Sequence, residues 1–479
     1  MNRALRDALL LLALTAAALA LHGYHLGVDD QVIYLPGIKK NLDPGLYPWD
    51  AVFFLSQTKL TLFDEMASWL TRSTGLSLEW AMFALYLTTT YVSLAACLSL
   101  ARRCFSSSVA HWAAVTMICA VLPLHATGTL VPMQDRYLHP RGLATAAILF
   151  AVTAVLDRKP RALAWLVFAS VLHPQMTFFG VLHIAVLMLL QARMPLQAAV
   201  FAQIPAWEPA NPAWRDVMLT RTHHYPLKWP WYEWLGVAFP MIPLWLFARS
   251  ARQRGDAVRA LVCRSFFLSG CLGIATAIVV STVPQLERFV PIQFMRVLHL
   301  IYWVFFLMLG GWLGERFLRH NALRWALCFG LIAAPVVYGY SFYYGASPHI
   351  EWPGRMPRHA WLEAFDWIRH KTPRNALFAL DPMYLERPRA DYHGFRALAE
   401  RSMLADYGKD RGVVGLFPEL AYQWRQEYED QRRWREFTAE DFRALKRKYG
   451  ITWVVLEKPG VPGLPCPYEN EKLLVCRVD

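Results

Sequence analysis

The sequence predicts a mostly α-helical membrane protein, with a bundle of about nine to eleven transmembrane helices followed by a small α/β domain. Composition and the recurrence of apolar runs predict this fold class. Of the 479 residues, 56% are hydrophobic and only 18% are charged, whereas soluble domains carry about 25% charged residues. Uncharged runs of about 20 residues recur, and each is long enough to cross a bilayer. The 20 Trp and 20 Tyr residues suit a protein with two water–lipid interfaces.

The chain begins with a charged segment and a first apolar run. Arg3 and Arg6 precede the apolar residues 8–21, and no small-residue cleavage site follows. A retained first helix with a cytoplasmic N-terminus therefore fits better than a cleaved signal peptide, because basic residues stay on the cytoplasmic side.

Further apolar runs follow, separated by short connections. They cover residues 80–100, 109–124, 143–156, 162–191, 235–247, 260–283, 291–313 and 325–344. Arg and Lys collect in alternate connections, which the positive-inside rule places in the cytoplasm. The run 162–191 contains His173-Pro174, and proline permits either one kinked helix or a hairpin of two short helices. Nine or eleven crossings result, and both totals place the C-terminus opposite the N-terminus.

The C-terminal part has the composition of a soluble domain. Helices are expected over 360–370, 395–405, 418–435 and 439–449, and strands over 376–380, 451–456 and 472–478. This alternation predicts a small α/β domain. The chain is therefore expected to divide into a transmembrane domain, residues 1–345, with 23–78 as its first outer loop, and an exported domain, residues 346–479.

The cysteines and the absence of common motifs narrow the function. Six of the eight cysteines lie in or beside apolar runs, where a thiol behaves as a small hydrophobe. Cys466 and Cys476 flank a Tyr-Glu-Asn-Glu turn, so a disulfide and two free thiols are both open. The sequence lacks the short zinc, dinucleotide, ATP and serine-hydrolase motifs. The net charge of +13 is spread over membrane-flanking connections and predicts no nucleic-acid partner.

An acidic pair, Asp29 and Asp30, follows the first helix. Adjacent carboxylates near a low-dielectric boundary repel each other, which favours proton uptake by one of them and makes both candidate bases. The alternative is a solvated loop in which an Asp caps a helix, followed by a segment, 50–62, on the membrane surface.

A second polar cluster, Asp135, Arg136, His139 and Arg141, follows the third helix. Counting the crossings from a cytoplasmic N-terminus places this cluster on the outer side of the membrane. Arginines on that side need a partner, and a guanidinium suits the phosphate of a lipid. The alternative is an ion pair of Asp135 with Arg136 or Arg141 that closes a loop.

Two further residues interrupt apolar runs. His173 lies at the break in 162–191 and lines a cavity, or alternatively packs as a hydrogen-bonded core residue. Arg296 is expected about one turn into an apolar helix on the outer side, where an ionisable residue indicates function. A lipid phosphate is one counter-ion for Arg296; Glu287 or a lipid headgroup reached by snorkelling is the other.

The residues around the acidic pair resemble the GT-C superfamily of integral-membrane glycosyltransferases, which use polyprenyl-phosphate-linked sugars. The match is Asp29-Asp30-Gln31-Val-Ile-Tyr34, an acidic motif in the first outer loop with a tyrosine four residues later. Gln31 stands where the superfamily's second acid is expected, so Asp29 and Asp30 both stay open. The chain is also similar to a poorly characterised bacterial group of such proteins, through residues 30–48, 128–141, Trp367-Ile-Arg, Thr372-Pro373 and Phe395-Arg396.

The resemblance implies hexosyl or pentosyl transfer from a polyprenyl-phosphate-linked donor to a glycan, lipid or protein acceptor of the cell envelope. The reaction is expected on the outer face of the bacterial inner membrane, with the N-terminus cytoplasmic and the C-terminal domain periplasmic or extracellular. Asp30 is expected to be the general base and Asp29 its alternative. The expected donor-phosphate ligands are Arg136, Arg141 and Arg296, and the expected cavity residues are Asp135, His139, His173 and Tyr34.

No cofactor is firmly implied, and no residue is assigned as a metal ligand. Mg²⁺ or Mn²⁺ held by Asp135 with Asp29 or Asp30 stays an alternative. The rival functions are a lipid or solute transporter or flippase with a midplane site, a non-catalytic envelope-assembly subunit, and an O-antigen-type ligase or polymerase.

Overall fold

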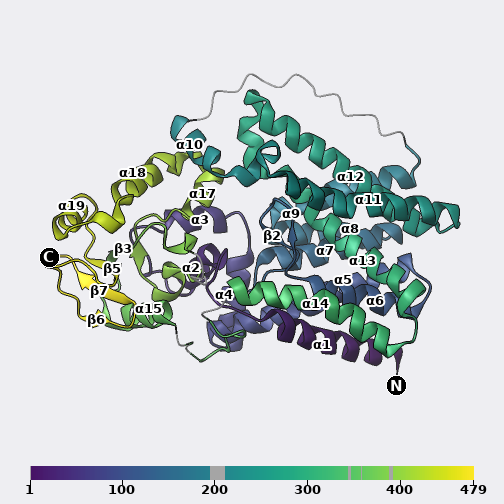
Figure 1. Cartoon of the computed structure of the whole chain (residues 1–479), viewed down its shortest axis with the longest axis horizontal. Helices are drawn as coiled ribbons and strands as arrows, with labels where there is room; N and C mark the ends of the chain where they lie inside the picture. The colour runs from purple at the N-terminus through teal and green to yellow at the C-terminus, as the bar shows by residue number, and fades with distance from the viewer. Residues whose placement is uncertain (1, 195–210, 344–346, 356, 358, 388–391) are drawn as a thin grey trace. The chain divides into compact units, whose positions relative to one another are not determined.

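The computed structural model describes residues 2–194, 211–343, 347–355, 357, 359–387 and 392–479. The chain forms two compact units (Figure 1). The helical unit contains Met1–His22, Leu85–Ala210 and Leu219–Tyr338. The C-terminal unit contains Gly23–Ala84, Asn211–Met218 and Gly339–Asp479, so the segment after the first helix joins the end of the chain.

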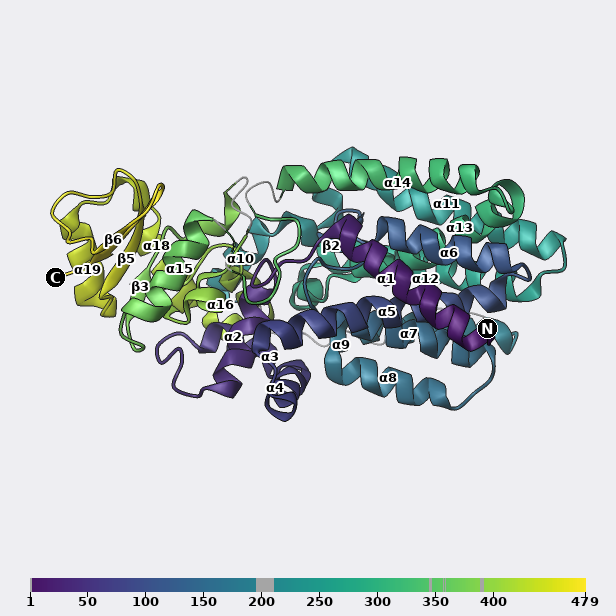
Figure 2. The same ribbon diagram turned by 90° about the horizontal axis from the view of Figure 1, so that it is seen from below.

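The helical unit is built from long apolar helices (Figure 2). They are α1 (Arg3–His22), α5 (Leu78–Cys104), α6 (Ser108–Val121), α7 (Pro140–Leu156), α8 (Arg161–Leu172), α9 (Pro174–Gln191), α11 (Trp231–Gln253), α12 (Ala257–Thr282), α13 (Val297–Leu313) and α14 (Ala322–Tyr343). Among the described residues, seven helical segments are long and apolar enough to cross a membrane, and α6, α7 and α8 are shorter apolar helices. The predicted polytopic helical architecture is confirmed.

The break at His173 produces a hairpin of two helices. In α8, Trp165 stacks on Phe150 of α7. In α9, a Cβ at Gly180 would meet Ile148 of α7 at 2.8 Å. Both helices thus lie beside the middle of α7, so the chain reverses direction at His173 and the kinked-helix alternative is not formed.

Basic side chains gather at one end of the helical unit. Arg103 Nη2, at the end of α5, lies 2.6 Å from Asp157 Oδ2 at the end of α7. Arg259 Nη1, in the first turn of α12, lies 3.2 Å from Glu315 Oε2 after α13. Arg259 Nε also donates to the carbonyl of Cys104, next to Arg103, so these basic connections, which the positive-inside rule assigns to the cytoplasm, share one end.

The C-terminal unit contains a five-stranded mixed sheet in the order β4-β3-β5-β7-β6. Its strands are β3 (Leu377–Ala379), β4 (Ser402–Met403), β5 (Trp453–Glu457), β6 (Tyr468–Glu469) and β7 (Leu473–Arg477). β3 is parallel to β4 and β5, whereas β7 is antiparallel to β5 and β6. The predicted α/β character of this part of the chain is confirmed.

Alternation along the strands supplies both faces of this sheet with core residues. Trp453 and Val455 pack in one hydrophobic cluster with α15 (Ala360–Lys371) and α16 (Phe395–Ala399). Val454 and Leu456 pack in a second cluster with α19 (Ala439–Tyr449). Helices therefore cover both faces.

The expected helix over 395–405 is wrong. Helix α16 ends at Ala399, because Glu400 adopts a left-handed conformation with φ +54°. Residues 402–403 then form β4 beside β3. Two-residue strands such as β4 and β6 are too short to produce a readable alternation in the sequence.

Residues 23–78, expected as an outer loop, contain three helices of the C-terminal unit: α2 (Gln31–Leu42), α3 (Val52–Thr58) and α4 (Phe63–Thr74). Val32 of α2 belongs to the core on the α15 face of the sheet. Backbone bridges join Tyr24 to Ile350 and Val28 to His393. These bridges attach the segment that carries the acidic pair to residues of the C-terminal part.

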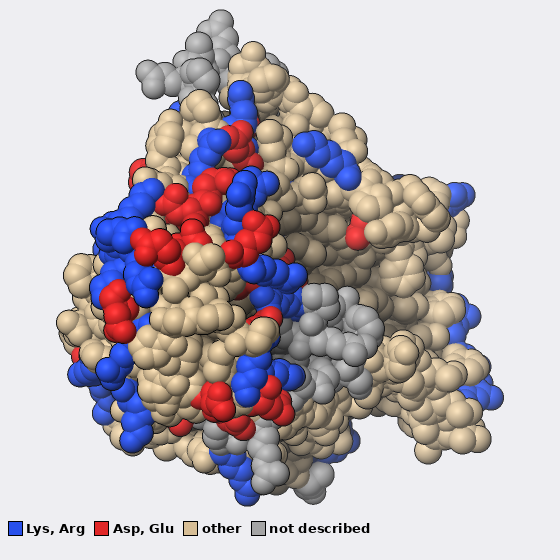
Figure 3. All heavy atoms as spheres, turned by 60° about the vertical axis from the view of Figure 1, so that its left-hand side comes forward, with Lys and Arg blue, Asp and Glu red and all other residues tan. Residues whose placement is uncertain are grey.

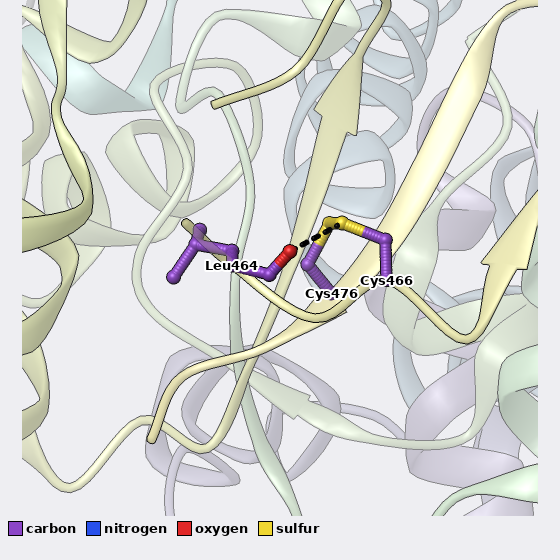
Figure 4. Close-up of a disulfide and its surroundings, with 3 residues drawn as sticks. All are labelled: Leu464, Cys466 and Cys476. Atoms are coloured by element: carbon purple, nitrogen blue, oxygen red, sulfur yellow. Dashed lines mark hydrogen bonds between the residues drawn. A yellow bond between two sulfur atoms is a disulfide. The ribbon is translucent and has the colours of Figure 1, made fainter. Parts of the chain in front are cut away.

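A disulfide and a mixed-charge surface characterise the C-terminal unit. Cys466 and Cys476 are bonded (Figure 4), with Cys466 just before β6 and Cys476 within its antiparallel neighbour β7. Lys and Arg are interspersed with Asp and Glu on the left-hand part of the view in Figure 3, and α19 contributes an Arg447–Glu440 pair. Interspersed charges of both signs are typical of a water-exposed surface.

Candidate functional site

Asp29 and Asp30 lie at the start of α2. Asp29 adopts a left-handed conformation with φ +50°, and its backbone N–H donates to the carbonyl of Tyr392. Asp30 occupies the N-cap position of α2, but its side chain makes no capping hydrogen bond. The side chains of Asp29 and Asp30 are 44% and 38% exposed. The helix-cap alternative for this pair is therefore not formed.

Lys409 is the partner of both acids. Its Nζ lies 2.8 Å from Asp30 Oδ1 and donates a second hydrogen bond to Asp29 Oδ1. Burial lowers the pKa of Lys409, but the charges of Asp29 and Asp30 and their hydrogen bonds outweigh it, so the pKa lies above its ordinary value. The ammonium is therefore charged and offsets the repulsion expected between the two carboxylates.

The backbone of Lys409 is held by a buried ionic cluster. The Lys409 N–H donates to Asp406 Oδ1 at 2.6 Å. Arg396, 1% exposed, donates from Nη1 and Nη2 to the two oxygens of Asp410, each at 2.9 Å. Arg396 Nε donates to Asp50. One guanidinium thus serves three buried carboxylates, Asp50, Asp406 and Asp410.

One carboxyl group of this cluster, that of Asp410, binds a proton more tightly than an exposed aspartate does. Burial raises the pKa of Asp410, the charge of Arg396 lowers it, and repulsion from Asp406 raises it again, to about 7. Three carboxylates around one cation leave excess negative charge in a low-dielectric interior, which favours protonation of one of them.

A second buried cluster fixes the segment that carries the acidic pair. Glu351 Oε1 lies 2.9 Å from both His25 Nδ1 and His393 Nε2, and its Oε2 accepts the N–H of Leu26. Burial raises the pKa of Glu351, but the charges and hydrogen bonds of His393 and His25 outweigh it and keep the pKa below its usual range. At Gly27, with φ +75°, a Cβ would meet Leu398 at 2.8 Å.

Tyr34, expected in the cavity, lies on α2 and is 3% exposed. Its ring meets Phe63 of α4 edge to face, with centroids 5.8 Å apart. Gln57 Nε2 donates to its hydroxyl at 3.4 Å. Tyr34 therefore packs α2 against α3 and α4.

The second polar cluster belongs to the helical unit. Arg141 Nη2 donates to Asp135 Oδ1 and Oδ2 at 2.6 and 2.8 Å, and both residues are buried. The Asp135–Arg141 ion pair is thus the alternative that forms. His139 caps α7, and its Nδ1 accepts the N–H of Arg141 at 3.0 Å. Arg136 is half-buried in the same connection.

His173 and Arg296 lie in the same part of the helical unit as the second polar cluster. His173 caps α9, where its Nδ1 accepts the N–H of Met176, and its ring lies 5.7 Å from that of His139. Arg296 Nη1 donates to Gln175 Oε1, two residues after His173. When neutral, both capping histidines carry their proton on Nε2, since Nδ1 accepts a backbone N–H.

One expectation for Arg296 is wrong. It does not lie one turn into an apolar helix but directly before α13, which begins at Val297. Gln293, with φ +56°, and Pro291 interrupt the apolar run, so residues 284–292 form a 3₁₀ segment instead. Arg296 therefore occupies the N-cap position of α13.

These residues provide two kinds of chemistry. The C-terminal unit presents two exposed carboxylates beside a lysine ammonium, which suits proton abstraction. The helical unit presents guanidinium groups and histidines, which suit an anion. Within the described parts of the chain, no group of three or more His, Cys, Asp or Glu residues is arranged to hold a metal ion.

Among the solved structures that this chain resembles are two of an archaeal oligosaccharyltransferase. The oligosaccharyltransferase of Archaeoglobus fulgidus, crystallised with Zn and sulfate, is similar over 93% of this chain and 67% of its own, with 12% identity and a TM-score of 0.43. The same organism's oligosaccharyltransferase AglB, in complex with an inhibitory peptide and a dolichol-phosphate, is similar over 94% and 69%, with 12% identity and a TM-score of 0.45. No family model and no curated protein matches the chain.

Sequence reasoning missed Lys409, Glu351 and Arg396. Each lies in the C-terminal part and pairs with a residue of the segment 23–84: Lys409 with Asp29, 380 positions away, Glu351 with His25, and Arg396 with Asp50. No local spacing links such pairs.

Proposed function

We propose that this chain is a membrane glycosyltransferase that moves a sugar from a polyprenyl-phosphate-linked donor to a cell-envelope acceptor. The observation that carries the proposal is the exposed acidic pair at the start of α2, bridged by the ammonium of Lys409. Such an arrangement is expensive for a purely structural loop, because two adjacent exposed carboxylates and a largely buried lysine must be held together.

Asp30 acts as the general base in this proposal. Attack of an acceptor hydroxyl on the anomeric carbon breaks the bond between that carbon and the donor phosphate oxygen. The acceptor proton passes to the Asp30 carboxylate, and the bond electrons leave with the polyprenyl phosphate. Asp29 shares Lys409 with Asp30 and is the alternative base.

The leaving phosphate gains negative charge during this step and needs cationic or hydrogen-bonding partners. Arg136, Arg141 and Arg296 are the proposed partners, with the Nε2–H groups of His139 and His173 as further donors. Arg141 uses Nη2 for both of its bonds to Asp135, an ion pair that fixes the direction of the guanidinium. Holding a cationic group in place before the charge develops is what makes such stabilisation effective.

The proposed reaction takes place on the outer face of a bacterial inner membrane. The basic connections share one end of the helical unit, which the positive-inside rule assigns to the cytoplasm. The Cys466–Cys476 disulfide favours an oxidising compartment for the C-terminal unit. A lipid-linked donor fits this side, because the lipid carries the activated sugar across.

The proposal is tested with the purified full-length protein in lipid nanodiscs. Polyprenyl-phosphate-linked glucose, mannose, galactose and arabinose are supplied separately, each with a bacterial envelope extract as the source of the acceptor hydroxyl, and release of polyprenyl phosphate is measured by mass spectrometry. At least one of these donors is expected to be cleaved, whereas the corresponding nucleotide sugars are expected to stay intact.

Nanodiscs without protein serve as the control for spontaneous hydrolysis. Consumption of nucleotide sugars with no cleavage of any lipid-linked donor would contradict the proposal, and so would release no faster than in the control.

A further inference from the structure

Lys409 contacts both candidate bases, although it takes no part in the proposed proton transfer. Its Nζ binds Oδ1 of Asp29 and Oδ1 of Asp30, so the ammonium engages one oxygen of each carboxylate. The Lys409 side chain is 22% exposed, less than either acid. A cation in this position controls both the charge and the orientation of the pair.

We infer that Lys409 is a positioning residue that keeps Asp30 ionised and oriented for proton abstraction. The inference rests on the proposed function. Two adjacent carboxylates repel each other, and without a nearby cation one of them binds a proton at a higher pH. An ammonium 2.8 Å from Asp30 offsets this repulsion and binds one oxygen of each carboxylate, so the other oxygen of Asp30 keeps a fixed direction.

The buried cluster behind Lys409 explains why the ammonium reaches this point. Asp406, 0% exposed, accepts the backbone N–H of Lys409 and that of Asp410. Arg396 then holds Asp410 through two hydrogen bonds of 2.9 Å. A lysine side chain has high rotamer entropy, but a fixed backbone limits the positions that its Nζ can occupy.

The same cluster connects Lys409 to the segment that carries the acids. Arg396 Nε donates to Asp50, whose Oδ2 also accepts the N–H of Met403 at 3.0 Å. Asp50 and the acidic pair belong to the continuous segment Gly23–Ala84 of the C-terminal unit. Residues of the C-terminal part thus supply the Lys409 ammonium and also hold its backbone in place. This part of the chain therefore has a role in the proposed reaction.

The test compares pH profiles of donor cleavage for wild-type protein and Lys409→Met, which keeps the length of the side chain but not its charge. The full-length protein in nanodiscs cleaves the lipid-linked donor identified above between pH 5 and 9. Loss of an opposite charge at hydrogen-bonding distance is expected to move the acidic limb upward by about one pH unit or more. Cleavage on the acidic side then falls about tenfold, while Lys409→Arg keeps the wild-type limb.

A double variant separates this role from a structural one. Asp29→Asn removes the repulsion that Lys409 offsets, so Asp29→Asn/Lys409→Met is expected to return the acidic limb toward that of wild type. Loss of a purely structural contact would not be rescued by removing a second one. Lys448→Met, which breaks a Lys448–Asp430 pair of the same unit, is the matched control and is expected to leave the profile unchanged.

Failure of the inference on Lys409 and failure of the proposed function give different results. If Lys409→Met folds and keeps the wild-type limb, or if the double variant stays displaced, the role of Lys409 is overturned. If wild-type protein cleaves no lipid-linked donor, the proposed function itself fails.

Discussion

Charged residues in the core of the C-terminal unit depend on partners from distant parts of the chain. Arg396 is 1% exposed and is surrounded by Asp50, Asp406 and Asp410. Breaking a buried pair by removing one partner leaves an uncompensated charge, whereas removing an excess charge relieves repulsion. The three acids of this cluster therefore differ in what their substitution does.

Asp406→Asn is expected to stabilise the C-terminal unit at pH 8 by about 1 kcal/mol, or about 2–4 °C in Tm. Asp406 Oδ2 makes no hydrogen bond and lies 3.7 Å from Arg396 Nη1. The amide keeps the oxygen that accepts the Lys409 and Asp410 N–H groups but removes one of two excess negative charges.

The stabilisation expected from Asp406→Asn should disappear as the pH falls toward 5. The pKa of Asp410 is raised to about 7 in the folded state, so the folded protein binds a proton that the unfolded chain releases at lower pH. Stability from this group is present below its unfolded pKa and is lost as the pH rises through 7. Thermal unfolding of the full-length protein between pH 5 and 8 measures the difference, and a Tm change independent of pH would contradict this reading.

At the scale of elements, sequence patterns predicted segments but not their partners. The runs 376–380 and 472–478 contain β3 and β7, and the run 451–456 covers all but the last residue of β5, because alternation within one strand is a local property. Residues 23–78 were expected as an outer loop, but α2 is fixed by packing on the C-terminal residues, as Val32 is on the sheet. The acidic pair could be read from the sequence, but Lys409 could not.

Glu351→Gln is expected to loosen the segment 24–30 that carries the acidic pair. Glu351 Oε1 is shared by His25 and His393, and its Oε2 holds the N–H of Leu26. An amide replaces one of these acceptor oxygens with a donor, so at least one buried N–H loses its partner.

Amide hydrogen exchange of peptides covering 23–31 measures this effect, and faster exchange by about tenfold or more is expected. Glu471→Gln, whose side chain is 73% exposed, is the control and is expected to change nothing. Equal protection in Glu351→Gln and wild type would show that the cluster does not hold the segment.

At the scale of the whole molecule, composition predicted the division between apolar helices and a charged C-terminal part. In the part of the chain that the structure describes, seven apolar segments meet the length that a bilayer requires, and the terminal part folds around a five-stranded sheet. The candidate bases belong to one compact unit and the candidate phosphate ligands to the other, and no local sequence pattern links the two sets.

The most direct measurement is the rate at which Asp30→Asn cleaves the lipid-linked donor. The substitution removes the proposed base without changing its volume, so cleavage is expected to fall by about 100-fold or more, with Tm and membrane insertion unchanged. Asp29→Asn, which leaves the Lys409–Asp30 contact in place, is expected to lose less than about tenfold. An Asp30→Asn protein that cleaves the donor at the wild-type rate would contradict the account.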